Sequence, residues 1–191
     1  FGTPISSWKI QKVIARHGLY PNPKRAENTA AKRRRAWKKK RITELVTKPR
    51  PGFLFGLDTV VRHFEGRKRY ILTAVDRHSR LAFARMYGTH SSLTAADFLR
   101  KLHLLLNGQL VHIQTDNGSE FQLHFRRTAQ ELKLGHYWSR VRTPKDNSQV
   151  ERFNRTVREE FVPLVEGWTD VSKLDAAIFQ WLDEYNHERP H

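Results

Sequence analysis

Residues 53–88 read FLFGLDTVVRHFEGRKRYILTAVDRHSRLAFARMYG and contain three apolar stretches with the composition of β-strands. The stretches cover 53–64, 69–77 and 81–88, and only EGRK and HSR separate them. Strands joined by connections this short pair antiparallel, because a parallel connection needs a crossover of a dozen or more residues. The stretch therefore predicts a three-stranded antiparallel meander.

Helical and strand patterns alternate after the meander. Apolar residues recur at helical spacing over 91–107, and LVHIQTDNG (110–118) predicts a fourth strand. The remaining expected elements are a helix over 121–134, a fifth strand over 135–141, a helix within 143–161 and a last helix over 170–186. This order predicts an α/β domain with a five-stranded mixed sheet flanked by helices. A right-handed crossover would place the first and fourth strands side by side.

The chain before the meander has a different composition. SSWKIQKVIARHG (6–18) predicts one short amphipathic helix, too short to form a domain alone. We assign residues 1–27 to the end of a helical, helix-turn-helix-like DNA-binding region, 28–52 to a basic linker and 53–191 to the core domain. The chain starts without Met, and we expect it to be part of a longer protein.

The formal net charge of +16 is concentrated near the N-terminus. Residues 1–50 contain 15 Lys and Arg against two acids, whereas residues 51–191 contain 20 against 17. The run KRRRAWKKKR supplies eight of the basic residues: Lys32, Arg33, Arg34, Arg35, Lys38, Lys39, Lys40 and Arg41. Basic segments of this kind neutralise phosphates, so we expect double-stranded DNA as a partner. A solvated tail and a nuclear-import signal are the alternative interpretations.

Two classes of protein are disfavoured by composition. No apolar run is long enough to span a bilayer and no leader resembles a signal peptide, so we expect no membrane partner. The chain has no cysteine, which excludes disulfides and thiolate zinc sites.

Three acidic residues lie where an α/β sheet places its ligands, at strand ends and in the loops beside them. Asp58 lies within the first strand, Asp116 ends the fourth, and Glu151 opens the helix after the fifth. Neighbouring carboxylates repel unless a cation or a proton lies between them, and three acids form an oxygen cage suited to Mg²⁺ or Mn²⁺. Two such ions about 4 Å apart can activate an attacking oxygen and stabilise the leaving oxygen of a phosphodiester.

Each acid also has a simpler interpretation. Asp58 could be an edge-strand charge that faces water, and Asp116 could form an Asx turn before Asn117. Glu151 could be a favourable first-turn charge paired with Arg155. The predicted strand order and the basic segment favour the metal site over the three separate interpretations.

Four blocks and a closing segment carry a resemblance to a known family. GLDTVV, YILTAVDRHSRLAFA, QTDNGSEF and TPKDNSQVERFNRTVREEF, in this order, resemble the catalytic core of DDE-type integrases and insertion-sequence transposases. The closing YNHERPH resembles the segment that follows this core in bacterial members. The resemblance covers about residues 53–191. Thirty-four residues separate Asp116 from Glu151, one fewer than is usual in retroviral integrases, which favours the transposase branch.

The resemblance implies a ribonuclease-H-like fold and a site of two Mg²⁺ or Mn²⁺ ions held by Asp58, Asp116 and Glu151, with Asp58 bridging both. It gives Asp76 a structural role. Candidate DNA contacts beside the third ligand are Lys145, Asn147, Gln149, Arg152, Asn154 and Arg155.

The implied activity is that of a polynucleotidyl transferase. It would cut DNA at a transposon end and join the 3′-hydroxyl to target DNA, as a dimer or higher homo-oligomer. We expect such a protein in the bacterial cytoplasm, on the nucleoid when bound to DNA. A DNA-binding or assembly protein with an inactive core and a nuclease of the same fold are the alternatives.

Overall fold

The structure is a computed structural model that describes residues 6–19, 39–140 and 143–188. The chain divides into two compact units, residues 1–38 and 39–191. The first unit contains the expected short helix, α1 (Ser7–Arg16), none of whose residues is buried. No helix in the described ranges is long and apolar enough to cross a membrane.

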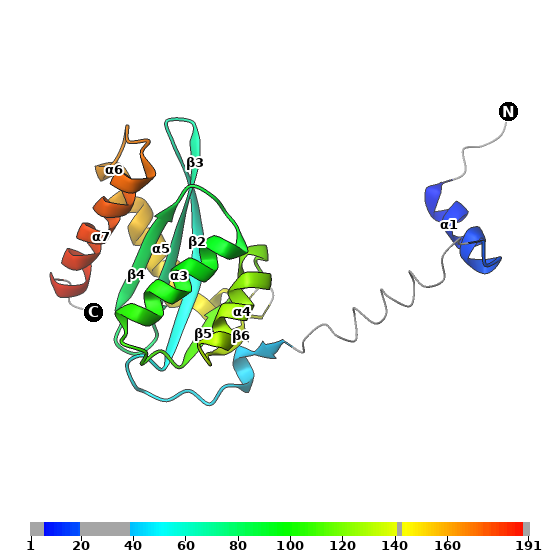
Figure 1. Ribbon diagram of the computed structural model, residues 1–191, viewed down its shortest axis with the longest axis horizontal. Helices are drawn as coiled ribbons and strands as arrows, with labels where there is room; N and C mark the ends of the chain where they lie inside the picture. Colours follow the sequence, from blue (N-terminus) through cyan, green and yellow to red (C-terminus); the bar gives the residue numbers. More distant parts are fainter. Residues whose placement is uncertain (1–5, 20–38, 141–142, 189–191) are drawn as a thin grey trace. The chain divides into compact units, whose positions relative to one another are not determined.

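The second unit is built on the predicted meander (Figure 1). Strands β2 (Leu54–Phe64), β3 (Arg67–Asp76) and β4 (Ala82–Tyr87) pair antiparallel in chain order. Strand β5 (His112–Thr115) pairs parallel to β2, which confirms that the first and fourth expected strands are neighbours. Strand β6 (Gly135–Trp138) then pairs parallel to β5.

The prediction of five strands was wrong by one. A sixth strand, β1 (Lys40–Arg41), pairs parallel to β6 at the edge, and the sheet order is β1-β6-β5-β2-β3-β4. The following 3₁₀ turn η1 (Ile42–Glu44) inserts Ile42 into a small apolar cluster with Phe53, Leu54 and Tyr137. The run KKKR carries no apolar alternation, so the sequence pattern gave no sign of this strand.

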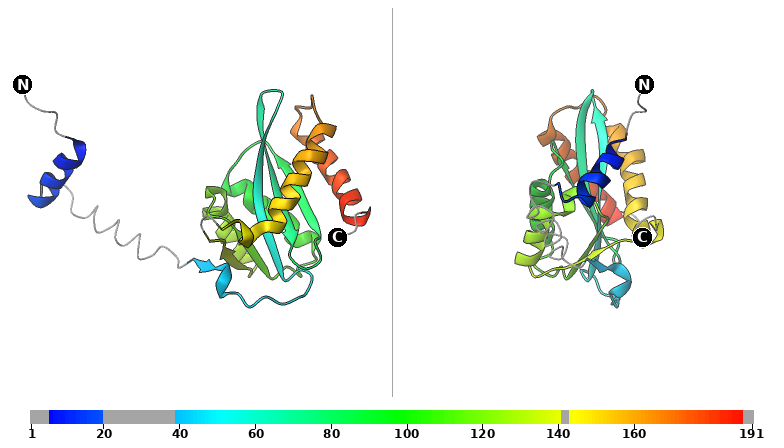
Figure 2. Two further views of the ribbon diagram at one scale, coloured as in Figure 1. Left: turned by 180° about the vertical axis from the view of Figure 1, so that it is seen from behind. Right: turned by 90° about the vertical axis from the view of Figure 1, so that its right-hand side faces the viewer.

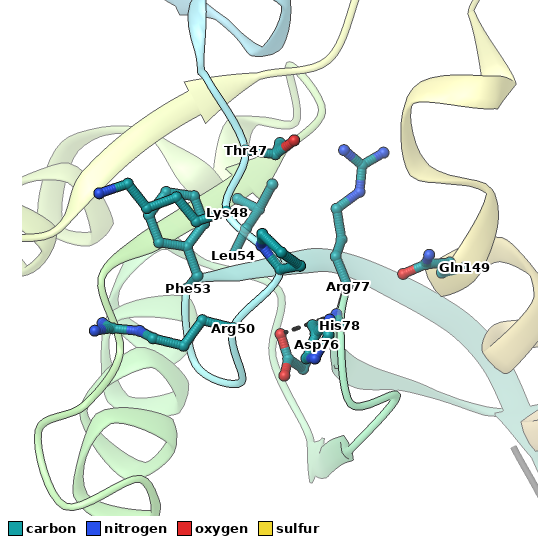
Figure 3. Close-up of a pocket in the computed structure, with 10 residues that line it drawn as sticks. Thr47, Lys48, Arg50, Phe53, Leu54, Asp76, Arg77, His78 and Gln149 are labelled. Atoms are coloured by element: carbon teal, nitrogen blue, oxygen red, sulfur yellow. Dashed lines mark hydrogen bonds between the residues drawn. The ribbon is translucent and has the colours of Figure 1, made fainter.

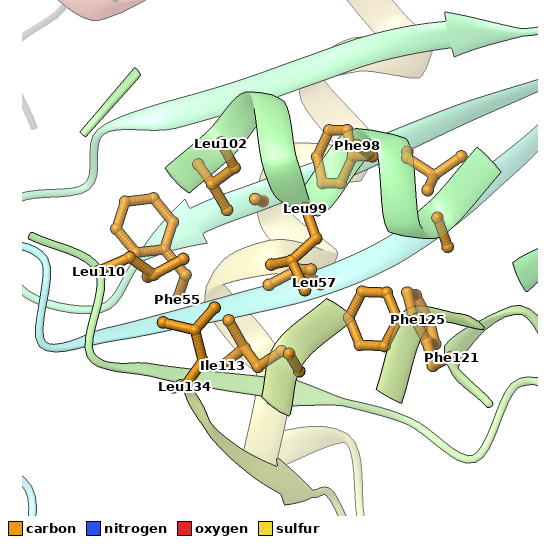
Figure 4. Packing of buried hydrophobic residues seen from close by; sticks show 14 of the residues in the cluster. Phe55, Leu57, Phe98, Leu99, Leu102, Leu110, Ile113, Phe121, Phe125 and Leu134 are labelled. Atoms are coloured by element: carbon orange, nitrogen blue, oxygen red, sulfur yellow. The ribbon is translucent and has the colours of Figure 1, made fainter. Parts of the chain in front are cut away.

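One face of the sheet is covered by α3 (Ser92–Leu105), η2 (Ser119–Phe121) and α4 (Leu123–Glu131). Phe55 and Leu57 point from β2 into this layer and pack against Phe98, Leu99 and their neighbours (Figure 4). Because side chains alternate along a strand, this places Asp58 on the opposite face.

The opposite face is covered by one bent helical segment and the last helix (Figure 2). The segment runs through η3 (Pro144–Asn147), α5 (Ser148–Thr156), the π-helical turn η4 (Val157–Phe161) and α6 (Val162–Leu164), and α7 (Val171–Glu188) follows. Val60 and Phe64 of β2 pack here against Val150, Phe153 and Phe161. Asp58 therefore lies on the face that α5 covers.

Candidate active site

Asp58 is held in place by a buried amide from α5. Asn154 donates from Nδ2 to Asp58 Oδ2 at 2.7 Å, and the main-chain N–H of Thr59 donates to Oδ1 at 2.8 Å. The Asn154 Oδ1 in turn accepts from the hydroxyl of Thr73, the residue opposite Asp58 on β3. Asn154 and Thr73 are almost completely buried, so this chain of hydrogen bonds fixes the orientation of the carboxylate.

Asp116 follows directly after β5 and lies beside Asp58. The parallel register pairs Gly56 with Gln114, so the two aspartates follow at matching positions two residues further along. Asp116 Oδ1 accepts the N–H of Gly118 at 2.8 Å, which is the bond expected of an Asx turn.

Burial and mutual repulsion disfavour the charged forms of both aspartates. Burial raises the pKa of Asp58 to about 6, and the charges of Asp116 and Glu120 contribute in the same direction. The pKa of Asp116 is also raised, first by burial and then by the charge of Glu120. A group of carboxylates in this state gains from a cation that neutralises it.

Glu120 is an acid of this site that the sequence analysis missed. Its side chain is only 8% exposed, and its Oε1 accepts from Thr59 Oγ1 at 3.0 Å and lies 3.0 Å from His90 Nε2. The His90 ring stacks on Tyr70. The available signal was the position of Glu120 within QTDNGSEF, four residues after Asp116 and next to an apolar residue.

Glu151 lies in the first turn of α5, where the sequence placed it, and is exposed to solvent. The described part of the chain holds no group of three acidic or imidazole side chains close enough together to bind a metal ion. The chemistry of the two aspartates fits a divalent cation, because their carboxylates are adjacent, partly desolvated oxygen ligands. The structure thus brings together two of the three expected ligands and leaves Glu151 apart from them.

The loop before α5 is anchored from the sheet. Its carbonyl at Asp146 accepts from Arg77 Nη2 and from Gln114 Nε2, both at 2.7 Å. The carboxylate of Asp146 is bound by the main chain and the guanidinium of Arg140. These hydrogen bonds hold the pKa of Asp146 below its usual value.

The expected DNA contacts near Glu151 divide into two groups. Lys145, Arg152 and Arg155 are exposed, and Gln149 is half-buried. Asn147 turns toward the sheet, where a Cβ on Gly56 would collide with its side chain. Asn154 is buried and supports Asp58, so it does not face solvent as a DNA contact would.

The end of the basic run reaches the rim of the acidic site. Lys39 Nζ donates to Asn117 Oδ1 at 2.7 Å, and Arg41 Nη1 donates to the carbonyl of Ser139 at 3.3 Å. Burial lowers the pKa of Lys39, and the nearby cations Arg126 and Arg41 act in the same direction. Lys40 is exposed in β1. The other basic residues of the run, Lys32, Arg33, Arg34, Arg35 and Lys38, lie outside the described residues.

Asp76 has the structural surroundings that the resemblance implied. The residue is 1% exposed, and its carboxylate accepts from the main-chain N–H of Gly52 and from both the N–H and the hydroxyl of Ser79. It therefore joins the turn after β3 to the segment before β2.

Known proteins resemble this chain in sequence. Two family models, both described as integrase core domain, match residues 48–144 and 132–191. The "Putative integrase ORF3" of Spiroplasma virus SpV1-C74 is 26% identical over 142 residues, which is 65% of this chain and 39% of that protein.

Solved retroviral structures share the fold. A chain of the simian T-cell lymphotropic virus intasome, in complex with PP2A regulatory subunit B56 gamma, aligns with a TM-score of 0.64 and 20% identity over 77% of this chain and 52% of that one. The HTLV-2 integrase catalytic core domain, in complex with magnesium and in its dimeric form, aligns with a TM-score of 0.61 and 21% identity. The alignment covers 73% of this chain and 89% of that one. The fold is thus the ribonuclease-H-like fold of these cores.

The chain spans about two fifths of the viral relative and about half of the intasome chain. One family model alone, over residues 48–144, matches more than half of the present chain. The chain belongs to the integrase core domain family.

Proposed function

We propose that this chain is the catalytic core of a DNA transposase or integrase that cuts a DNA end and transfers the resulting 3′-hydroxyl into target DNA. The observation that carries the proposal is the adjacent pair Asp58 and Asp116: Asp58 lies in β2, Asp116 follows the neighbouring parallel strand β5, and the pKa of each is raised by burial and by nearby acids. Membership of the integrase core domain family supports the same reaction class.

Asp58 and Asp116 would hold Mg²⁺ or Mn²⁺, with two ions per site and Glu151 as the third ligand. Divalent ions at such a site supply activation of the attacking oxygen and neutralisation of the leaving oxygen of a phosphodiester. The HTLV-2 core was solved in complex with magnesium, which is consistent with this choice of metal.

The chain's own residues orient this site. Asn154 and the Thr59 N–H fix the carboxylate of Asp58, and the Gly118 N–H fixes that of Asp116. Glu151 is carried by α5, whose buried Val150 and Phe153 attach the helix to the sheet. In the proposed complex, the first turn of α5 would shift so that the Glu151 carboxylate reaches Asp58 and Asp116.

DNA is the proposed substrate, both as the end that is cut and as the target. The last residues of the basic run lie beside Asn117 and Ser139, close to Asp116, and would contact the DNA backbone there. A homo-oligomer is proposed because two DNA ends must be brought together. The related HTLV-2 core is described in dimeric and trimeric forms.

The test uses the longest available protein that contains this sequence, a labelled transposon-end duplex, a target plasmid and Mg²⁺ or Mn²⁺. Asp116→Asn and Glu151→Gln should each lower cleavage and joining by at least about a hundredfold, because each removes a ligand charge. DNA affinity should stay nearly unchanged. Glu159→Gln, an exposed acid further along the same helical segment, is the matched control.

Each other outcome identifies an alternative. Cleavage without joining would favour a nuclease of the same fold. Full activity of Glu151→Gln would remove that residue from the site. Tight DNA binding without any metal-dependent product would favour a DNA-binding or assembly protein with an inactive core.

A further inference from the structure

A pocket of about 340 Å³ lies at the start of β2, away from the acidic site (Figure 3). Three parts of the core meet there: the segment that leads into β2, the turn after β3 and the first turn of α5. The lining residues are Thr47, Lys48, Pro49, Arg50, Phe53, Leu54, Asp76, Arg77, His78 and Gln149. The volume is at the lower end of the range of about 300–1,000 Å³ that is usual for ligand sites.

The charge of the lining is positive. Lys48, Arg50 and Arg77 contribute three cations, and the one acid among the lining residues is Asp76. That carboxylate is buried and saturated by hydrogen bonds from main-chain N–H groups and the Ser79 hydroxyl, so it has little capacity left to pair with the cations.

Arg77 is the most informative of the three cations. Its guanidinium donates to a main-chain carbonyl, that of Asp146, while the carboxylate of the same residue is held by Arg140. Burial is the main cause that lowers the pKa of Arg77, and the charge of Asp146 only partly offsets it. A half-buried guanidinium whose nearest acid is bound elsewhere is a favourable partner for an anion.

Gln149 provides a second polar group at the pocket. Its Oε1 is buried and has no hydrogen-bond partner within the described residues. The amide can rotate and present its NH₂ instead, because the two orientations differ little in shape. Arg77 and Gln149 stand on the same side of the pocket, whereas Lys48 and Arg50 extend from the other wall with their charged ends outward (Figure 3).

We propose that this pocket binds a backbone phosphate of the DNA that occupies the acidic site. The proposal rests on the proposed function, and it adds a second point of attachment for the same duplex. Arg77 and Gln149 would contact the phosphate, and Lys48 and Arg50 would neutralise it from the rim.

The distance between the two sites agrees with a duplex that spans both. Leu54 lines the pocket and Asp58 lies four residues further along β2, which at about 3.3 Å per residue is roughly 13 Å. One strand of DNA rises about 3.4 Å per nucleotide, so a duplex of a few base pairs is long enough to reach both points.

The test measures affinity for a labelled DNA duplex, without divalent ions, as a function of NaCl concentration. Arg77→Gln should weaken binding about tenfold and lower the salt slope by about one, since one phosphate contact is lost. Lys48→Gln combined with Arg50→Gln should also lower the slope. This second variant matters because Arg77 also anchors the Asp146 loop, whereas the two rim side chains are exposed.

Arg67→Gln is the matched control, because it removes the same charge from the exposed hairpin at the far end of β2. Its slope should equal that of the unchanged protein. Equal slopes for the control and for both pocket variants would overturn the proposal.

A second arm separates the sources of phosphate. Inorganic phosphate is added to the unchanged protein and to the Lys48, Arg50 double variant, and thermal unfolding is followed. Stabilisation of the unchanged protein alone, together with unchanged DNA slopes, would make the pocket a free-phosphate site and overturn the DNA assignment. Neither arm requires catalysis. A negative result in the joining assay can therefore be told apart from the absence of phosphate binding in the pocket.

Discussion

Burial disfavours the charged form of the Asp58 carboxyl group, so we expect the stability of the fold to depend on pH. The pKa of this group in the folded protein is raised to about 6, above the value of about 4 in an unfolded chain. Between these values the folded state binds the proton more tightly. The free energy of unfolding therefore falls as pH rises from about 4 to 6, and it stays lower above that range.

Asp58→Asn should remove this loss. We expect the variant to be more stable than the unchanged protein by about 1–2 kcal/mol at pH 8 without divalent ions, with little difference at pH 4. Urea unfolding at the two pH values measures the effect, and Mg²⁺ should stabilise only the unchanged protein. If the variant is less stable at both values, the lost acceptor for Asn154 outweighs the gain from no longer burying a charge.

At the scale of elements, the buried side chain of Ile42 stabilises β1 more than the strand's own pairing with β6 does. The strand has two residues, and Ile42, directly after it, is 7% exposed within the cluster that contains Phe53 and Tyr137. Two residues of edge pairing give little independent stability. The anchor therefore decides whether Lys39 stays beside Asn117.

Ile42→Ala should release this edge while leaving the rest of the sheet folded. We expect faster amide hydrogen exchange over residues 39–45, unchanged exchange in β2 and β3, and a loss of about 1–2 kcal/mol in global stability, below the usual range for a core isoleucine because the site can open locally. Val46→Ala, at an 83% exposed position of the same segment, is the control. Unchanged exchange over 39–45 would show that pairing with β6 suffices.

Elements with a clear periodicity were predictable from the sequence. The meander follows from alternating apolar residues and two short turns, and the pairing of β2 with β5 follows from crossover handedness. The strand β1 was not predictable, because its stability comes from a residue that follows it and from a partner almost a hundred residues away. The break of the α5 segment into a π-helical turn has no counterpart in the apolar pattern either.

At the scale of the whole molecule, some residues of the candidate site could be predicted from the sequence and others could not. Asp58 stood out because a charge within an apolar strand is costly unless it is paired, and Asp116 because α/β sheets place their ligands at strand ends. Glu120 and the Asp146 anchor were missed, since each gains its role from residues distant in sequence, namely Thr59 and His90 for the first and Arg77 and Gln114 for the second. Such roles depend on tertiary contacts that a single sequence does not display.

The distribution of charge along the whole chain predicts that mutations can change DNA affinity and DNA cleavage separately. The net charge of +16 comes mainly from residues 1–50, whereas the acids of the site lie in the core. Replacing the eight basic residues of the Lys32–Arg41 run by glutamine should weaken binding by about the same factor for all DNA sequences. It should also reduce the salt slope by about 0.9 for each phosphate contact that is lost.

Glu151→Gln serves as the opposite variant in the same titration, because it should keep the salt slope while losing cleavage. Two partial variants then divide the run. Glutamine at residues 32–35 and 38 tests the part outside the described residues, and glutamine at 39–41 tests the part that reaches Asn117 and Ser139. A reduced slope for the second alone would place the DNA contacts at the rim of the acidic site. An unchanged slope for the complete replacement would mean that the run does not contact DNA, and the nuclear-import or solvated-tail interpretation would then stand in its place.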